Sequence, residues 1–136
     1  RWFGNAPELL ADVRGEAAAR LIARIESAAA DYPFAKHYAV WPGPNSNTFT
    51  AWVTRAVPEL KVDLPPTAIG KDYLADRIVD SAPSGRGFLL SLGGLIALTA
   101  SPVEGLEFSL LGLTFGINPF DPALKLPVLG RIGPNR

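Results

Sequence analysis

Residues 41–49 read Trp41-Pro42-Gly43-Pro44-Asn45-Ser46-Asn47-Thr48-Phe49. An aromatic and β-branched run over residues 38–41 leads into this stretch and indicates a short strand. Apolar side chains at helical spacing over residues 48–57 follow it and indicate an amphipathic helix. Two prolines and a glycine restrict the connection, and Ser46 or Asn47 has the side chain expected of a helix N-cap. The stretch therefore predicts a strand–loop–helix unit.

The residues before this unit predict two helices. The clearer one covers residues 16–30, where apolar side chains recur at three- and four-residue steps: Ala18, Leu21, Ile22, Ile25 and Ala29. It ends before Pro33, because the residue that precedes a proline disfavours the helical region. Pro7, placed near a first helical position with acidic residues after it, predicts a shorter helix over residues 5–14.

The residues after the unit change from irregular to strand-like. Residues 58–86 are broken by prolines and glycines, and only residues 71–79 indicate a helical turn or two. Residues 88–99 alternate between large apolar side chains at even positions and smaller ones at odd positions. This alternation predicts one half-buried strand.

A second apolar run over residues 106–117 follows a turn at residues 101–105. Its alternation shifts by one residue beside Gly112, which predicts a β-bulge within one strand. Residues 121–127 predict a short edge strand guarded by proline. Together these elements predict an α+β domain, in which the helices and the strand–loop–helix unit pack on the apolar face of a C-terminal antiparallel sheet with two long strands and a short third.

The composition limits the chemistry of the chain. With 136 residues it is expected to form one domain, 1–136. The absence of cysteine excludes disulfides and thiolate nucleophiles, and a single histidine excludes a His-cluster metal site, so we expect no metal or cofactor. Lys+Arg and Asp+Glu are equal at 13 each, and the arginines are scattered, so we expect no nucleic-acid partner. The first residue is arginine and no methionine is present, which predicts the C-terminal portion of a longer protein.

Ser46 is the candidate catalytic residue. At a helix N-terminus, free backbone N–H groups and the helix dipole favour a developing oxyanion, which suits a nucleophile in acyl transfer. His37, nine residues earlier, is the candidate base. The alternatives are that Ser46 only caps the helix and that His37 is a surface residue beside Lys36. The stretch also lacks the flanking glycines of a nucleophile elbow.

Five residues are candidates for ligand binding. Trp41 is expected either to pack in the core or anchor its loop, or to form the wall of a pocket. Asn45 and Asn47 are expected either to hydrogen-bond a ligand or to shape their own loop. Lys71 and Asp72 lie in the irregular segment and are expected to face a cleft, the alternative being a solvated turn. They do not form a phosphate-binding loop, because Pro65 stands where the first glycine of that motif belongs.

Several segments spread over nearly the whole chain resemble an uncharacterised bacterial family. These segments are residues 2–4, 7–10, 32–33, 41–49, 56–60, 64–73 and 122–127. The resemblance implies a longer protein with an upstream part, typically a membrane-anchoring stretch and a His-Xaa-Trp-like strand. The family has no established activity that the resemblance could transfer to this chain.

The aromatic run, the Asn-Xaa-Asn-Thr-Phe turn and the helix are also similar to the nucleophile segment of permuted papain-like hydrolases of the NlpC/P60 superfamily. In those enzymes a cysteine stands at the helix start, whereas this chain has Ser46 there. The similarity implies that thiol catalysis is lost. It also implies that the catalytic histidine would lie upstream of Arg1, so that His37 would not be it.

These observations favour one function and leave two alternatives. The favoured one is a non-catalytic or degenerate papain-like binding module of the bacterial cell envelope, with a small-molecule, peptide or lipid-like ligand. The first alternative is a serine-variant hydrolase or acyltransferase that uses Ser46. The second is a membrane-associated structural protein that uses a hairpin over residues 87–118. Residues 87–100 are too few to form a membrane-spanning helix, which needs about 20 residues. The expected location is the envelope or a membrane, and otherwise the cytoplasm.

Overall fold

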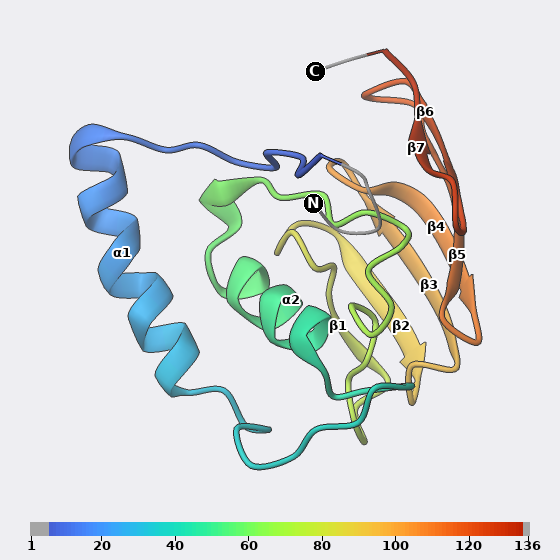
Figure 1. The fold of residues 1–136 in the computed structure, drawn as a ribbon, viewed down its shortest axis with the longest axis horizontal. Coiled ribbons are helices and arrows are strands. Elements are labelled where there is room, and N and C mark those ends of the chain that lie inside the picture. Colours follow the sequence, from blue (N-terminus) through green and yellow to red (C-terminus); the bar gives the residue numbers. More distant parts are fainter. Residues whose placement is uncertain (1–5, 135–136) are drawn as a thin grey trace.

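The computed structural model describes residues 6–134, which form two helices and one seven-stranded antiparallel sheet (Figure 1). This confirms the predicted α+β class. The helices are α1 (Gly15–Ala30) and α2 (Ser46–Ala56), with a 3-10 turn, η1 (Pro58–Leu60), after α2. The strands are β1 (Val79–Ser81), β2 (Phe88–Leu92), β3 (Ile96–Ser101), β4 (Gly105–Leu110), β5 (Leu113–Asn118), β6 (Ala123–Leu126) and β7 (Gly130–Ile132).

Helix α1 confirms the helix predicted over residues 16–30. The shorter helix predicted over residues 5–14 is wrong across its described part, because residues 6–14 are not helical. Nearly all of these residues are exposed, so no packing stabilises a helix that is too short to persist alone. Asn5, at its start, and residues 2–4 of the family resemblance lie outside the described residues.

Helix α2 confirms the helix of the strand–loop–helix unit, but its cap is Asn45 and not Ser46 or Asn47. The strand predicted over residues 38–41 is absent, since this segment is an irregular loop without a strand partner. Its backbone bonds within the loop instead: the Ala39 N–H donates to the Pro44 carbonyl at 2.8 Å. Helix α2 is also joined to α1, because Trp52 Nε1 donates to the Ala28 carbonyl at 2.7 Å.

The sheet is a meander in which every strand pairs with the next one along the chain. The single strand predicted over residues 88–99 is in fact β2 and β3, joined by a turn. The run over residues 106–117 is likewise the hairpin of β4 and β5. The phase change marks a two-residue turn and not a bulge, because Leu111 and Gly112 both have positive φ, 52° and 86°, as tight hairpin turns require. The short strand predicted over residues 121–127 is confirmed as β6, but its predicted edge position is wrong, because β7 pairs with it and forms the edge.

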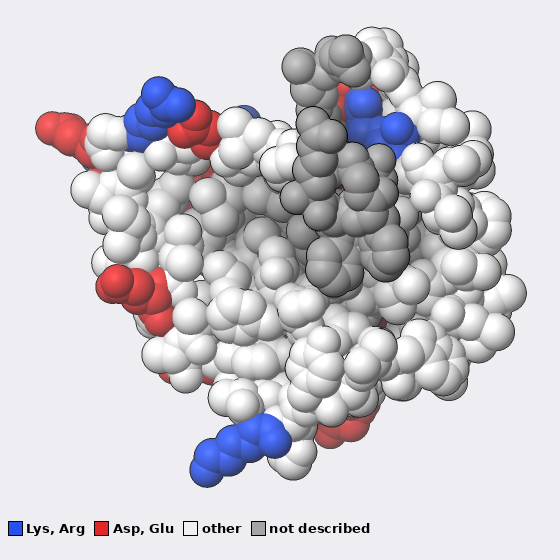
Figure 2. Space-filling view, in the orientation of Figure 1, with Lys and Arg blue, Asp and Glu red and all other residues white. Residues whose placement is uncertain are grey.

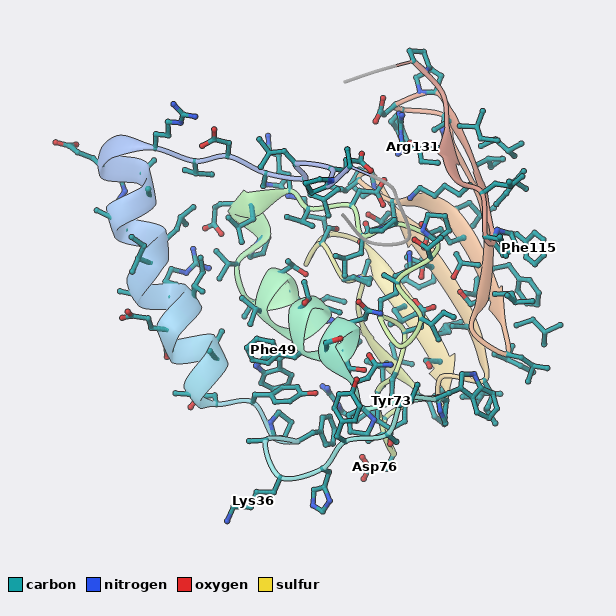
Figure 3. All side chains as sticks on the ribbon, in the orientation of Figure 1. Lys36, Phe49, Tyr73, Asp76, Phe115 and Arg131 are labelled. Atoms are coloured by element: carbon teal, nitrogen blue, oxygen red, sulfur yellow. The ribbon has the colours of Figure 1, made fainter. Side chains whose placement is uncertain are left out.

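The two faces of the sheet differ sharply in character. The outer face consists of the large apolar side chains that point away from the helices, each between 38 and 60% exposed: Val79, Phe88, Leu90, Leu92, Ile96, Leu98, Leu106, Phe108, Leu110, Leu113, Phe115, Ile117, Leu124 and Ile132. Figure 3 shows Phe115 projecting outward, and Figure 2 shows only uncharged side chains along that edge of the molecule. The prediction that the helices pack on the apolar face is therefore wrong.

The buried, inner face carries side chains that are mostly small or polar. Its side chains come from the alternate positions of the same strands: Leu89, Ser91, Ala97, Thr99, Ser101, Glu107, Ser109, Thr114, Asn118 and Lys125. The segment over residues 61–77 lies between α2 and this face (Figure 1). Its apolar side chains form two small clusters, one with Ala51 of α2 and one with Leu89 and Ala97 of the sheet. Because this segment covers the polar face, that face is the buried one. No helix of residues 6–134 is both long and apolar enough to cross a membrane.

Candidate functional site

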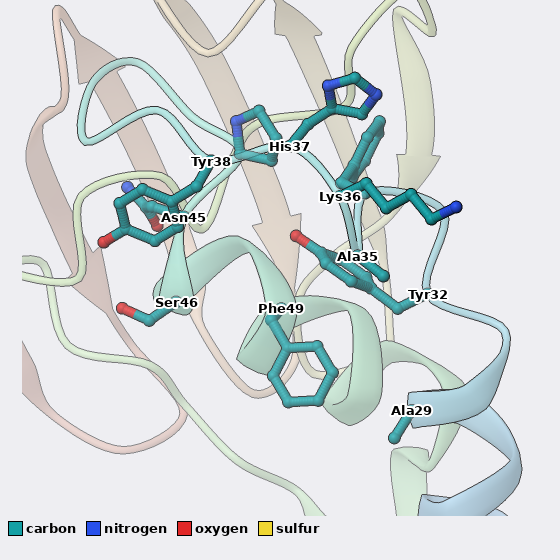
Figure 4. Close-up of a pocket in the computed structure, with 11 residues that line it drawn as sticks. Ala29, Tyr32, Ala35, Lys36, His37, Tyr38, Asn45, Ser46 and Phe49 are labelled. Atoms are coloured by element: carbon teal, nitrogen blue, oxygen red, sulfur yellow. The ribbon is translucent and has the colours of Figure 1, made fainter.

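A pocket of about 580 Å³ opens beside the first turn of α2 (Figure 4). The end of α1, the turn over residues 34–38 and the start of α2 supply its lining: Ala29, Tyr32, Phe34, Ala35, Lys36, His37, Tyr38, Pro44, Asn45, Ser46 and Phe49. Tyr32 meets the rings of Phe49 and Phe34 edge to face, with centroids 5.1 and 5.6 Å apart. Burial, with the neighbouring Tyr73, raises the pKa of Tyr32, so its hydroxyl stays neutral. The lining is thus rich in aromatic side chains, and Lys36 is its one lysine or arginine.

Ser46 and His37 both line this pocket but do not form a catalytic pair. Ser46 is exposed at the first position of α2, and His37 is exposed in the turn after α1. No hydrogen bond joins the two side chains, and the His37 ring points away from Ser46 (Figure 4). Among residues 6–134, His37 is the only imidazole that could serve as the base for Ser46, so this part of the chain offers Ser46 no activating histidine.

The N-terminus of α2 is already capped by the protein itself. The Asn45 side-chain oxygen accepts hydrogen bonds from the Asn47 and Thr48 N–H groups at 2.9 and 3.2 Å. In return, Thr48 Oγ1 accepts from the Asn45 N–H at 3.0 Å, which completes a capping box. An oxyanion hole needs free N–H donors aimed at the reacting atom. Here two of the donors that such a hole would use are occupied.

Asn45 and Asn47 fasten the loop over residues 41–49 to the covering segment. Asn45 Nδ2 donates to the Val40 and Ile69 carbonyls at 2.9 and 3.0 Å, and Asn47 Nδ2 donates to the Ile69 carbonyl at 2.9 Å. Gly70 permits this approach, because a Cβ atom there would lie 2.5 Å from Asn45 Nδ2. Both asparagines therefore shape the loop, which was one of the two roles predicted for them.

Trp41 is not among the residues that line this pocket. It is 49% exposed, and its Nε1 donates to the Leu111 carbonyl at 3.0 Å. This bond joins the loop over residues 41–49 to the turn between β4 and β5. Trp41 is thus an anchor of the loop on the sheet.

Lys71 and Asp72 do not face a cleft, and they are not in a solvated turn either. Lys71 is 1% exposed, and its Nζ lies 2.7 Å from Glu107 Oε2. Lys125 Nζ lies 2.6 Å from Glu107 Oε1 and 2.6 Å from Asp63 Oδ1. We call these four groups, Asp63, Lys71, Glu107 and Lys125, the charge cluster. It contains two cations and two carboxylates, so it balances its own charge inside the protein.

The electrostatics of the charge cluster follow from this arrangement. Burial alone would raise the pKa of Glu107, but the ammonium groups of Lys71 and Lys125 outweigh burial and hold that pKa below its usual value. Burial likewise works against a charged Lys71, yet Glu107 and Asp72 raise the pKa of its ammonium group. For Asp63, burial wins over Lys125 and raises the pKa of the carboxyl.

Asp72 lies beside the charge cluster, and only one of its two carboxylate oxygens has a hydrogen-bond partner. Its Oδ2 accepts from Ser109 Oγ at 2.8 Å, whereas its Oδ1 is buried without a hydrogen-bond partner. Burial raises the pKa of Asp72 despite the opposing effect of Lys71.

The sequence contains one signal for this polar interior. Glu107 stands between Leu106 and Phe108, so it must point to the opposite face from those large apolar side chains.

The fold and the site together define an α+β domain with an aromatic pocket beside a self-capped helix. The chain belongs to a family described as a protein of unknown function, DUF3750, because the sequence model of that family matches residues 1–73. This confirms the predicted membership of an uncharacterised family. The match contains α1, α2 and the loop over residues 41–49, and it ends before β1. Searches of curated proteins and of solved structures found no match.

Proposed function

We propose that this chain is a non-catalytic binding module whose pocket beside α2 takes an apolar or aromatic group of a small molecule or peptide. The observation that carries the proposal is the aromatic lining formed by Tyr32, Phe34 and Phe49 around a pocket of about 580 Å³. Concave sites lined by aromatic side chains, with a few polar groups at the edge, are typical of small-molecule binding. Ser46 and His37 supply those polar groups here.

The alternative, a hydrolase or acyltransferase with Ser46 as nucleophile, has less support. It requires a base within hydrogen-bond reach of Ser46 and free donors for an oxyanion. The described residues offer Ser46 no such base, and the Asn45 side chain occupies the Asn47 and Thr48 N–H groups. The degenerate papain-like origin and the envelope location are parts of our proposal that rest on the sequence resemblance alone.

The binding proposal is tested by titrating the ¹⁵N-labelled chain with p-cresol and N-acetylphenylalanine amide, two neutral aromatic probes. We expect saturable shifts in the amide resonances of residues 29–49. Ala29→Phe should fill the pocket and abolish the shifts, because Ala29 is part of the lining. Ala23→Phe is the matched control, since Ala23 is exposed on the same helix and lies outside the lining. Shifts that spread over the sheet, or that survive in Ala29→Phe, would refute the pocket.

The hydrolase alternative has its own test. A fluorophosphonate probe forms a covalent bond only with an activated serine. We expect no labelling of the wild type or of Ser46→Ala. Labelling of the wild type that disappears in Ser46→Ala would make Ser46 a nucleophile and would reject the non-catalytic assignment.

A further inference from the structure

The outer face is too large and too apolar to be ordinary protein surface. It contains fourteen large apolar side chains, and no charged side chain points outward from the strands that carry it. The basic residues of β6 and β7, Lys125 and Arg131, are paired with each other in register and lie on the opposite face. Contiguous apolar patches beyond a few hundred Å² usually mark an interaction site.

We propose that the outer face is covered by the outer face of a second copy of this chain. At roughly 80 Å² for each half-exposed leucine- or phenylalanine-sized side chain, the face offers on the order of 1,000 Å², above the ~800 Å² per partner that stable complexes bury. Two sheets can stack face to face at about 10 Å, as in a β-sandwich. A two-fold dimer uses the same patch on both copies, so one apolar face is sufficient.

The charge distribution supports a second copy as the partner. The chain has 13 basic and 13 acidic residues, so two copies approach without net repulsion. No charge needs to be desolvated at the centre of the interface, because the outer face has none. A lipid surface is less favoured, since the outer face has neither the lysine and arginine nor the tryptophan and tyrosine that typically contact lipid headgroups.

The shape of the outer face supports the same partner. Two grooves, of about 260 and 340 Å³, lie on it, and both are lined by Leu98 and Phe108. These two residues are cross-strand partners, so they form a ridge between the grooves. In a two-fold arrangement the ridge of one copy can enter a groove of the other. The sheet edges are poorer sites, because the edge strands β1 and β7 have only three residues each.

The test is the mass of the 136-residue chain in solution, measured by sedimentation velocity over a dilution series. We expect a dimer of twice 14.5 kDa. Leu98→Glu and Phe108→Glu should each weaken the dimer about 100-fold or more, because each buries an unpaired charge. Ile22→Glu is the control, since Ile22 is an apolar residue on α1 that is also about half exposed. A monomeric wild type, or a dimer that survives both sheet substitutions, would overturn the proposal.

A second measurement covers the case in which a glutamate variant fails to fold. The chain has no cysteine, so Phe108→Cys supplies a single site for a nitroxide label. Because stacked sheets lie about 10 Å apart, labels on two copies should be within about 30 Å by pulsed electron resonance. Labels at Ile22→Cys should be farther apart, because α1 lies across the molecule from the outer face (Figure 1). Longer distances at residue 108 than at residue 22, or a monomer that co-sediments with phosphatidylcholine vesicles, would contradict the proposal.

Discussion

The inner and outer faces of the sheet come from alternate residues of the same strands, yet they have opposite surroundings. The inner face is small, polar and buried, with Glu107 and Lys125 at its centre. The outer face is large, apolar and about half exposed. Apolar burial is the main favourable term in folding, so a monomer would be expected to bury the outer face. The alternation of side chains along each strand separates the two faces of the sheet. The segment that covers one face decides which of the two is buried.

The two faces contribute differently to the stability of the protein. On the inner face, the two lysines and two carboxylates of the charge cluster must all be present, because an unpaired buried charge is costly. On the outer face, the side chains keep about half of their surface exposed within one copy, so each stabilises it less than a fully buried side chain does. The comparison therefore predicts large effects of substitution on one side of each strand and small effects on the other.

The largest effect is expected from Glu107→Gln, which removes the carboxylate that both lysines share. Two buried ammonium groups would lose the carboxylate that they share, with Asp63 and Asp72 still nearby, and we expect a loss of about 3–5 kcal/mol in the free energy of unfolding. This loss is measured by urea denaturation, with unfolding monitored by circular dichroism. Glu59→Gln is the matched control, because Glu59 pairs with Arg24 at the surface and should cost less than about 1 kcal/mol. Equal losses in both variants would show that the charge cluster is not needed.

A smaller loss is expected from Asn45→Ala. This change removes the cap of α2 and leaves the Val40 carbonyl without the amide that it bonds. We expect a loss of about 2 kcal/mol in the free energy of unfolding. The neighbouring Ser46→Ala should change it by less than about 0.5 kcal/mol, because Ser46 is exposed and does not cap the helix. A larger loss for Ser46→Ala than for Asn45→Ala would contradict the cap assignment.

A third effect depends on pH and concerns Asp72. Since the folded carboxyl has a raised pKa, the folded state favours its protonated form. Below the ordinary value of 3.8 the group is protonated in both states. As the pH rises above that value, the wild type should lose stability relative to Asp72→Asn, until the pH passes the raised pKa. Urea denaturation at several pH values measures the difference, and Asp76→Asn, on the exposed surface, is the control. The opposite slope would mean that Lys71 stabilises the carboxylate more than burial disfavours it.

Much of the fold could be predicted from local patterns. The 3.6-residue period located α1 and α2, and the two-residue period located the segments that form β2 to β5. The turn between β4 and β5 was missed because Leu111-Gly112 shifts the alternation by one residue, as a bulge would, whereas the turn between β2 and β3 leaves the alternation unbroken from Leu92 to Ile96. Which face is buried could not be predicted, since it depends on the segment over residues 61–77, whose irregular path has no period.

The site was predicted less well than the fold. The stretch over residues 41–49 did identify the first turn of α2, where the pocket opens. Tyr32, Phe34 and Phe49 were missed as lining, because the contact of Tyr32 with Phe49 of α2 forms only in the folded protein. The charge cluster was also missed, because Glu107 and Lys125 come from strands that meet the covering segment only in the folded protein.

The most direct test of the two-face account compares Leu89→Ala with Leu90→Ala, two identical substitutions at adjacent positions of β2. Leu89 is 0% exposed and Leu90 is 39% exposed. Measured by urea denaturation at a concentration where the chain is monomeric, Leu89→Ala should cost about 2–4 kcal/mol, and Leu90→Ala less than about 1 kcal/mol. An equal or larger loss for Leu90→Ala in the monomer would mean that the outer face is covered within one copy, and the account would fail.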